Sequence, residues 1–142
     1  MLEQRDIKIA NFEVAQKKVI RELINIGFQL KDIVSINRSR YVILVGISRS
    51  ILLTFKRDPF FTYGDKFKNL GKKGYGDTIN CEDLDTAMRL QVTHIISVFE
   101  DGEAYTLPFG EFMEKSIKWV CAEGKSVRSI SLKEYKNFTL EE

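Results

Sequence analysis

The chain has 142 residues, of which 44% are hydrophobic and 30% are charged, and its formal net charge is +2. This length fits one domain, so we expect residues 1–142 to form a single unit with an ordinary hydrophobic core. The near balance of charge excludes nucleic-acid binding through a general basic excess, so any basic surface has to be local. The polar residues 1–6 predict no signal peptide, and no apolar run reaches the about 20 residues of a membrane span. We therefore expect a cytoplasmic protein that does not enter a membrane.

The residue types that carry metal or nucleophilic chemistry are few. Cys81 and Cys121 are far apart and form no CxxC pair, so we expect buried thiols rather than a disulfide or zinc ligands. His94 is the one histidine of the sequence and lies in a predicted strand, which argues against a catalytic triad and a multi-histidine metal site. The stretch from Gly71 to Gly76 lacks the spacing of a dinucleotide loop and the final Lys-Ser/Thr of a P-loop. An enzyme with an organic cofactor is therefore the weakest functional class.

The first predicted element is an amphipathic helix, because apolar residues recur at helical spacing. The residues of this apolar stripe are Phe12, Ala15, Val19, Leu23 and Ile26. Gly27 is expected to end the helix, and Phe28 to pack back onto it.

Three strands are predicted next, at residues 31–37, 41–47 and 51–56. The short connections between them favour an antiparallel meander. The second strand is almost entirely apolar, so it is expected to be central and covered on both faces. Gly46 within it indicates a bulge or the close approach of another group.

The remaining elements alternate between helices and strands. A second helix is expected to open within residues 77–84, with Asn80 as its cap, and strands follow at 93–99 and 104–107. A third helix is predicted over residues 109–122 and a last strand over 126–132. This order predicts an α/β (α+β) domain, with a mixed sheet built on the three-strand meander and flanked by helices.

The third predicted strand ends in a lysine. In the strand alternation, Lys56 shares a face with Leu52 and Thr54, and Asp58 follows two residues later. A lysine drawn against a sheet is costly unless it is paired or used. Lys56 is therefore either a structural lysine paired with a carboxylate or a lysine of a functional site.

The stretch from Pro59 to Asn80 combines glycines, aromatic residues and lysines. Such interleaving can form a surface for phosphates and bases, although a solvated loop with its aromatic residues in the core has the same composition. The candidate nucleic-acid contacts in and next to this stretch are Arg57, Tyr63, Lys66, Lys68, Lys72 and Lys73.

The order of helix, three-strand meander, helix and strand from Asn11 to Phe99 resembles the restriction-endonuclease-like, or PD-(D/E)XK, nuclease superfamily. The lysine that ends the third strand and the C-terminal hairpin from Ser97 to Tyr105 are similar too. The resemblance implies a core of order αβββαβ with a C-terminal βαβ extension, and it makes a homodimer plausible by analogy. It also implies acidic ligands for a divalent cation, usually Mg²⁺, and a lysine that acts with the cation at the scissile phosphate. That lysine corresponds to Lys56.

The sequence departs from the family pattern at the acidic positions. Thr54 stands at the position of the acidic ligand, and Gln16 stands nearest the helix glutamate of related junction-cleaving members. In one interpretation the carboxylates have moved: Asp58 shares the face of Lys56, and Asp65 or Asp77 approaches from the glycine-rich stretch. The candidate metal ligands are then Asp58 and Asp77, which with Lys56 would be the catalytic residues of a Mg²⁺-dependent DNA endonuclease. In the other, the fold is a catalytically inactive module or subunit that binds nucleic acid or protein. The spacing of Lys56 and Asp58 is compatible with both.

Overall fold

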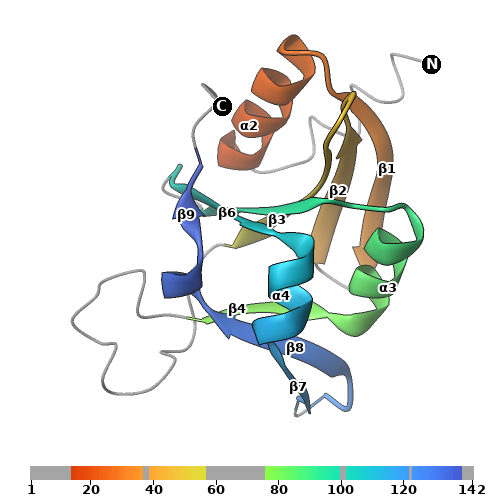
Figure 1. Ribbon diagram of the computed structural model, residues 1–142, viewed down its shortest axis with the longest axis vertical. Coiled ribbons are helices and arrows are strands. Elements are labelled where there is room, and N and C mark those ends of the chain that lie inside the picture. Colours follow the sequence, from red (N-terminus) through yellow and green to blue (C-terminus); the bar gives the residue numbers. More distant parts are fainter. Residues whose placement is uncertain (1–13, 37–38, 57–75, 100–101, 122, 139–142) are drawn as a thin grey trace.

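The computed structural model describes residues 14–36, 39–56, 76–99, 102–121 and 123–138, which form a mixed α+β fold (Figure 1). The helices and strands are α2 Val14–Asn25, β1 Gln29–Ile36, β2 Ser39–Val45, β3 Ser50–Lys56, β4 Gly76–Asn80, α3 Cys81–Arg89, β5 His94–Phe99, β6 Ala104–Pro108, α4 Phe109–Lys115, β7 Ile117–Val120, β8 Ser126–Ser131, a 3-10 helix Leu132–Glu134 and β9 Lys136–Asn137. Within these ranges, no helix is long and apolar enough to span a membrane.

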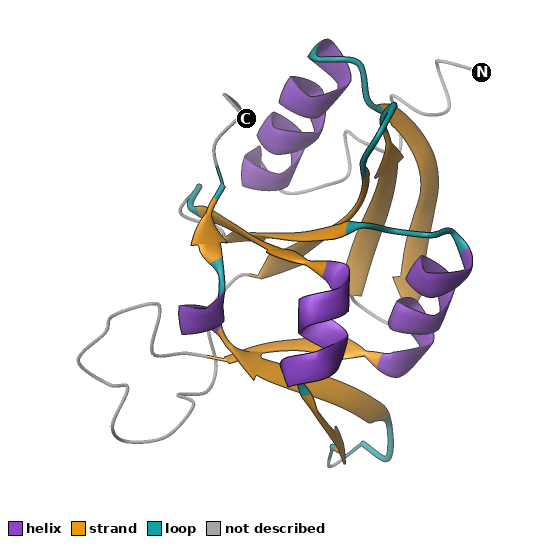
Figure 2. Cartoon of the chain, in the orientation of Figure 1, coloured by secondary structure: helices purple, strands orange, loops and turns teal. Residues whose placement is uncertain are grey.

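Two sheets organise these elements (Figure 2). The first has six strands in the order β1-β2-β3-β5-β6-β9, and the second has three in the order β4-β8-β7. Strands β1, β2 and β3 form the antiparallel meander that the sequence predicts. Strand β5 then pairs with β3 in parallel, with Thr54 opposite Ser97 and Lys56 opposite Phe99. A parallel pair needs a crossover connection, and β4 and α3 lie within it.

Helix α2 covers one face of the first sheet. Val19 and Leu23 of the predicted stripe are buried there, in a cluster with Leu53 of β3 and Ile96 of β5. Ile26 is a correction to the predicted stripe: it lies beyond the helix end and is 56% exposed.

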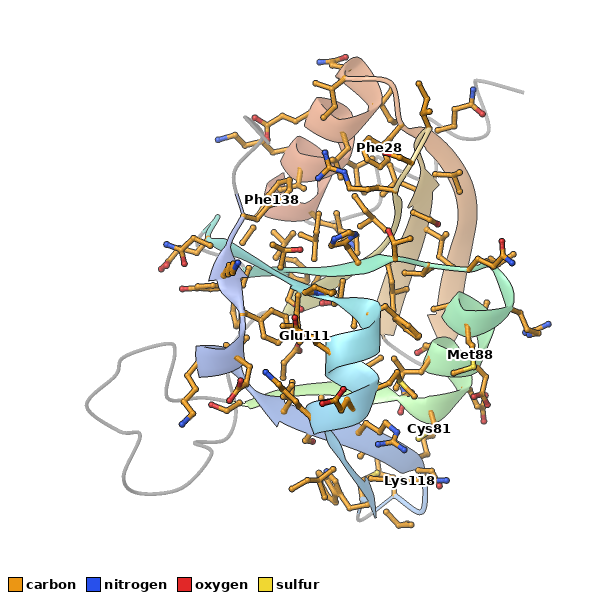
Figure 3. The ribbon with its side chains drawn as sticks, viewed as in Figure 1. Phe28, Cys81, Met88, Glu111, Lys118 and Phe138 are labelled. Carbon is orange, nitrogen blue, oxygen red and sulfur yellow. The ribbon has the colours of Figure 1, made fainter. Side chains whose placement is uncertain are left out.

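The turn after α2 brings the chain back onto the same cluster. Gly27 has a φ of +111°, a conformation that glycine adopts without strain, and it directs the chain out of the helix. Phe28 packs against the cluster as predicted, and Figure 3 shows it beside α2. Its ring atom Cε2 lies 2.9 Å from the place that a Cβ would take at Gly46. The close approach predicted at Gly46 is therefore confirmed.

The other face of the first sheet packs against α3, α4 and the second sheet. The buried side chains in this cluster include Leu52 of β3, Leu84 of α3, Phe112 of α4 and Ile130 of β8. The core therefore lies between the two sheets. Polar groups enclosed there are away from water.

The predicted helix over residues 109–122 is wrong beyond Lys115. The backbone of Ser116 is extended, with φ −75° and ψ 155°, and Ile117–Val120 forms β7 in antiparallel pairing with β8. Residues 117–120 read IKWV, and β-branched and aromatic residues fit a pleated sheet better than a helix. The C-terminal extension therefore contains an additional strand.

The residues before the second helix form a strand that the sequence reasoning missed. Gly76–Asn80 is β4, whose residues pair with β8, and helix α3 begins at Cys81. Asn80 occupies the predicted cap position, but its side chain makes no capping hydrogen bond. Asp77 is consequently a strand residue of the second sheet, where the prediction had placed it at the opening of a helix.

Candidate functional site: a buried hydroxyl–carboxylate chain

The face of β3 and β5 that looks toward the second sheet carries two hydroxyl residues. Thr54 and Ser97 are register partners in the parallel pair, and both are 0% exposed. The Thr54 Oγ1 atom donates a hydrogen bond to Ser97 Oγ at 2.9 Å. Ser97 Oγ in turn donates to Asp77 Oδ2 at 2.6 Å, which links the first sheet to β4 of the second.

The carboxylate of Asp77 accepts a second hydroxyl at the same oxygen. Tyr135, which follows the 3-10 helix, donates from its Oη atom to Asp77 Oδ2 at 2.7 Å. Asp77 is 1% exposed and Tyr135 is 3% exposed. Together Thr54, Ser97, Asp77 and Tyr135 form what we call the hydroxyl–carboxylate chain, with every proton directed toward the carboxylate.

The electrostatics of this chain keep the tyrosine protonated. Burial raises the pKa of Tyr135 well above its ordinary value, and the charge of Asp77 and their hydrogen bond raise it further. Tyr135 is therefore a hydrogen-bond donor at neutral pH. A buried carboxylate without donors would be costly, and the two hydroxyls that reach Oδ2 offset that cost.

The structure brings one of the predicted site residues to the strand that ends in Lys56. Asp77 reaches the sheet face through Ser97 and Thr54, and Thr54 lies two residues before Lys56. The backbone of Lys56 is the last position of β3, while its side chain lies outside what the structure describes. The other candidate residues fall in the range 57–75, outside the described residues: Arg57, Asp58, Tyr63, Lys66, Lys68, Lys72 and Lys73.

Asp77 is not arranged to hold a magnesium ion where it lies, and Asp58, the other predicted ligand, is outside the described residues. Mg²⁺ takes carboxylate oxygens and keeps several waters, which requires a site open to solvent. Asp77 is almost fully buried, its Oδ2 already accepts two hydroxyls, and Thr54 offers a neutral oxygen. Among the described residues, no group of three or more His, Cys, Asp or Glu is placed to hold a metal ion.

Sequence reasoning identified Asp77 but missed Ser97 and Tyr135. Ser97 left a weak signal, because it is a polar residue within the buried strand HIISVF. Tyr135 left none, because its partner lies 58 residues earlier in the chain. Their roles depend on the contact between the two sheets.

The cysteines and the histidine take no part in this chain. Cys81 and Cys121 are free cysteines, but each is only partly buried, so the prediction that both are buried is wrong. The Nδ1 atom of His94 shares a hydrogen bond of 2.8 Å with the Thr93 hydroxyl. Partial burial, with a smaller effect of the Arg49 charge, lowers the pKa of His94, so the ring is neutral near pH 7.

We compared the chain with protein-family models, curated proteins and solved structures, and none of the three comparisons finds a match.

Proposed function

We propose that this chain is a nucleic-acid-binding protein with a restriction-endonuclease-like fold, and that it binds without cutting. The strand arrangement supports the fold. A helix precedes an antiparallel three-strand meander, a second helix follows, and β5 joins the third strand in parallel. Apart from β4, which lies between the meander and α3, this is the element order that the sequence resemblance implies.

The hydroxyl–carboxylate chain supports binding without catalysis. At the position where the resemblance implies an acidic metal ligand, Thr54 presents a neutral hydroxyl that is 0% exposed and donates to Ser97. Asp77, the carboxylate that accepts from Ser97, links the two sheets and is 1% exposed. A group enclosed in this way contributes to folding and is shielded from a phosphodiester in solvent.

The binding part of the proposal rests on the local basic residues predicted from the sequence. Lys66, Lys68, Lys72 and Lys73 would contact phosphates, Arg57 would do the same next to β3, and DNA is the expected ligand. Contacts of this kind release counterions, so the affinity should fall steeply as salt rises.

A metal-dependent DNA endonuclease is the second candidate, and one observation favours it. Asp77 comes from outside β3, yet through two hydroxyls it reaches the face on which Thr54 lies, close in the chain to Lys56. In this candidate Lys56, Asp58 and Asp77 would be catalytic, and Asp77 would have to exchange its hydroxyl donors for Mg²⁺.

The test measures binding and cleavage separately with the full chain. Labelled single-stranded and duplex DNA of about 20 nucleotides is titrated at about 50 mM salt and read by fluorescence anisotropy. We expect saturable binding that weakens with salt, and a lower salt dependence when Lys66, Lys68, Lys72 and Lys73 are replaced by Ala. The control replaces Lys17, Lys18 and Arg21 of α2 by Ala, and it should leave the affinity and its salt dependence unchanged.

Cleavage decides between the two candidates. Intact DNA after prolonged incubation with Mg²⁺ or Mn²⁺ supports the binding module. Metal-dependent cleavage that is lost in Lys56→Ala supports the endonuclease, and cleavage that survives Lys56→Ala removes Lys56 from the site. If neither DNA form binds at low salt, the proposed function is wrong.

A further inference from the structure

Three exposed isoleucines lie where α2 ends and where β2 turns into β3. Ile24 is the second-last residue of α2, Ile26 follows the helix, and Ile47 lies in the turn between the two strands. Their exposed fractions are 37%, 56% and 108%, in that order. The close approach of the Phe28 ring to Gly46 brings the two segments together, and Figure 1 shows both at the upper end of the molecule. We refer to the three residues as the isoleucine tip.

The outer face of α2 places positive charge next to this tip. Lys17, Arg21 and Ile24 follow one another at i, i+4 and i+7, so they form one row along the helix. Glu22, the one acidic residue of α2, lies on a different flank of the helix. Residues 14–28 and 46–50 together hold Lys17, Lys18, Arg21 and Arg49 against Glu22, four positive charges and one negative, which gives +3. Because the whole chain has a net charge of +2, the remaining residues sum to −1, and the positive charge is concentrated at this end.

The shape and chemistry of the tip decide which partner it fits. With an exposure of 108%, Ile47 is as accessible as in an extended chain, so it protrudes from the surface and does not line a groove. A protein partner would need a matching hollow for such a side chain, whereas a bilayer accepts it without shape complementarity. An aliphatic side chain offers no ring on which a nucleic-acid base could stack. A second copy of the chain would bring two sets of Lys17, Lys18 and Arg21 together, and like charges across an interface repel.

We propose that the isoleucine tip and the basic row of α2 dock on the surface of an anionic lipid bilayer. Ile26 and Ile47 enter the headgroup region, while Lys17 and Arg21 contact the anionic headgroups. The burial of aliphatic side chains and the attraction to anionic lipid add to each other, so the two groups act as one surface. This inference goes beyond the proposed function and is independent of it, because the basic residues of that proposal lie in the range 57–75.

Sedimentation with lipid vesicles tests this surface on the full chain. Vesicles of phosphatidylcholine, with and without about 30% phosphatidylserine, are pelleted with the protein at about 100 mM salt, and the bound fraction gives the partition coefficient. We expect a partition coefficient at least about tenfold higher for the anionic vesicles, and a decrease as salt rises. Ile47→Ser and Arg21→Ala should each lower it at least about fivefold.

The chain offers one matched control for each kind of side chain. Met88 of α3 is an apolar side chain of similar exposure, 53%, and Lys118 of β7 is an exposed lysine. Both lie on other elements, so Met88→Ser and Lys118→Ala should each change the partition coefficient by less than about twofold. Circular dichroism checks that every variant is folded, and Ile26→Ser replaces Ile47→Ser if that variant is not.

The remaining outcomes overturn the inference. Absence of binding to anionic vesicles, or equal binding to neutral ones, removes an anionic bilayer as the partner. Binding that survives Ile47→Ser, or that falls equally in Met88→Ser, shows that another surface makes the contact. A dimer in sedimentation equilibrium that Ile47→Ser dissociates assigns the tip to a second copy. The DNA affinity should be the same with and without Ile47→Ser, so failure of this inference leaves the proposed function standing.

Discussion

Removal of one hydroxyl from the hydroxyl–carboxylate chain is the sharpest test of its structural role. Tyr135→Phe retains the buried ring and deletes the Oη atom that donates to Asp77 Oδ2 at 2.7 Å. Asp77 keeps the hydrogen bond from Ser97 at the same oxygen. The substitution therefore changes one hydrogen bond to a buried carboxylate and leaves the apolar packing in place.

The expected cost follows from the charge and burial of the acceptor. A hydrogen bond to a charged group contributes about 1.5–3 kcal/mol net, and Asp77 is 1% exposed, so water cannot replace the lost donor. We expect the free energy of unfolding to fall by about 2 kcal/mol. With a urea dependence of about 2 kcal/mol per molar, the unfolding midpoint should fall by about 1 M.

The chain offers a matched control in Tyr105→Phe. The Tyr105 hydroxyl donates to Glu103 Oε2 at 2.8 Å, and its ring packs edge-on against Phe99 at a centroid distance of 5.8 Å. Glu103 is exposed, so water can take over its hydrogen bond, and the loss should be below about 1 kcal/mol. Urea unfolding followed by circular dichroism measures both variants.

Equal and small losses in the two variants would contradict this reasoning. They would mean that the buried hydrogen bond from Tyr135 to Asp77 contributes no more stability than the exposed one from Tyr105 to Glu103. In that case the hydroxyl–carboxylate chain would not hold the two sheets together, and Asp77 would be available to a metal ion.

Three further predictions concern stability. Because burial and Asp77 raise the pKa of Tyr135 above the ordinary value of 10.0, its contribution to stability is complete below that pH and is lost as the pH rises through the folded-state pKa. Between about pH 10 and 12 the wild type should therefore lose up to about 1.4 kcal/mol per pH unit more than Tyr135→Phe, as measured by urea unfolding. Gly46→Ala should destabilise by about 1–3 kcal/mol, because the new Cβ would lie 2.9 Å from the Phe28 ring, and Phe28→Leu should reduce that loss. Phe112→Ala should cost about 3–5 kcal/mol in the same assay, since Phe112 is 0% exposed in the larger core cluster.

Elements with a strong local signal were predictable from the sequence. Helix α2 was predictable because Val19 and Leu23 recur at helical spacing, and the meander because three apolar runs are joined by short connections. Glycine at position 27 marked a helix end, and at position 46 it marked a close approach. The helix and its end depend on neighbouring residues and the meander on consecutive strands, whereas Phe28, the group that approaches Gly46, is 18 residues away and could not be named from the sequence.

Elements that depend on distant pairing were not predictable. Strand β7 continues an apolar pattern that also fits a helix, and its pairing with β8 decides between the two. Strand β4 likewise needs β8, which lies about fifty residues later in the chain. A short strand has no stability of its own, so its sequence carries little information until a neighbour supplies the hydrogen bonds.

Some features of the candidate site were likewise predictable from the sequence, and others depended on tertiary packing. The lysine at the end of β3 is conspicuous because it follows an apolar strand, whereas Asp77 was one of several carboxylates proposed from the family resemblance. That Asp77 accepts hydroxyls from Ser97 and Tyr135 follows from the packing of two sheets, which joins residues 20 and 58 positions apart. Burial of a charge is a property of the assembled core, since solvent is excluded once both sheets are in place. Local pattern therefore identified which groups could act, and tertiary packing decided that one of them is enclosed.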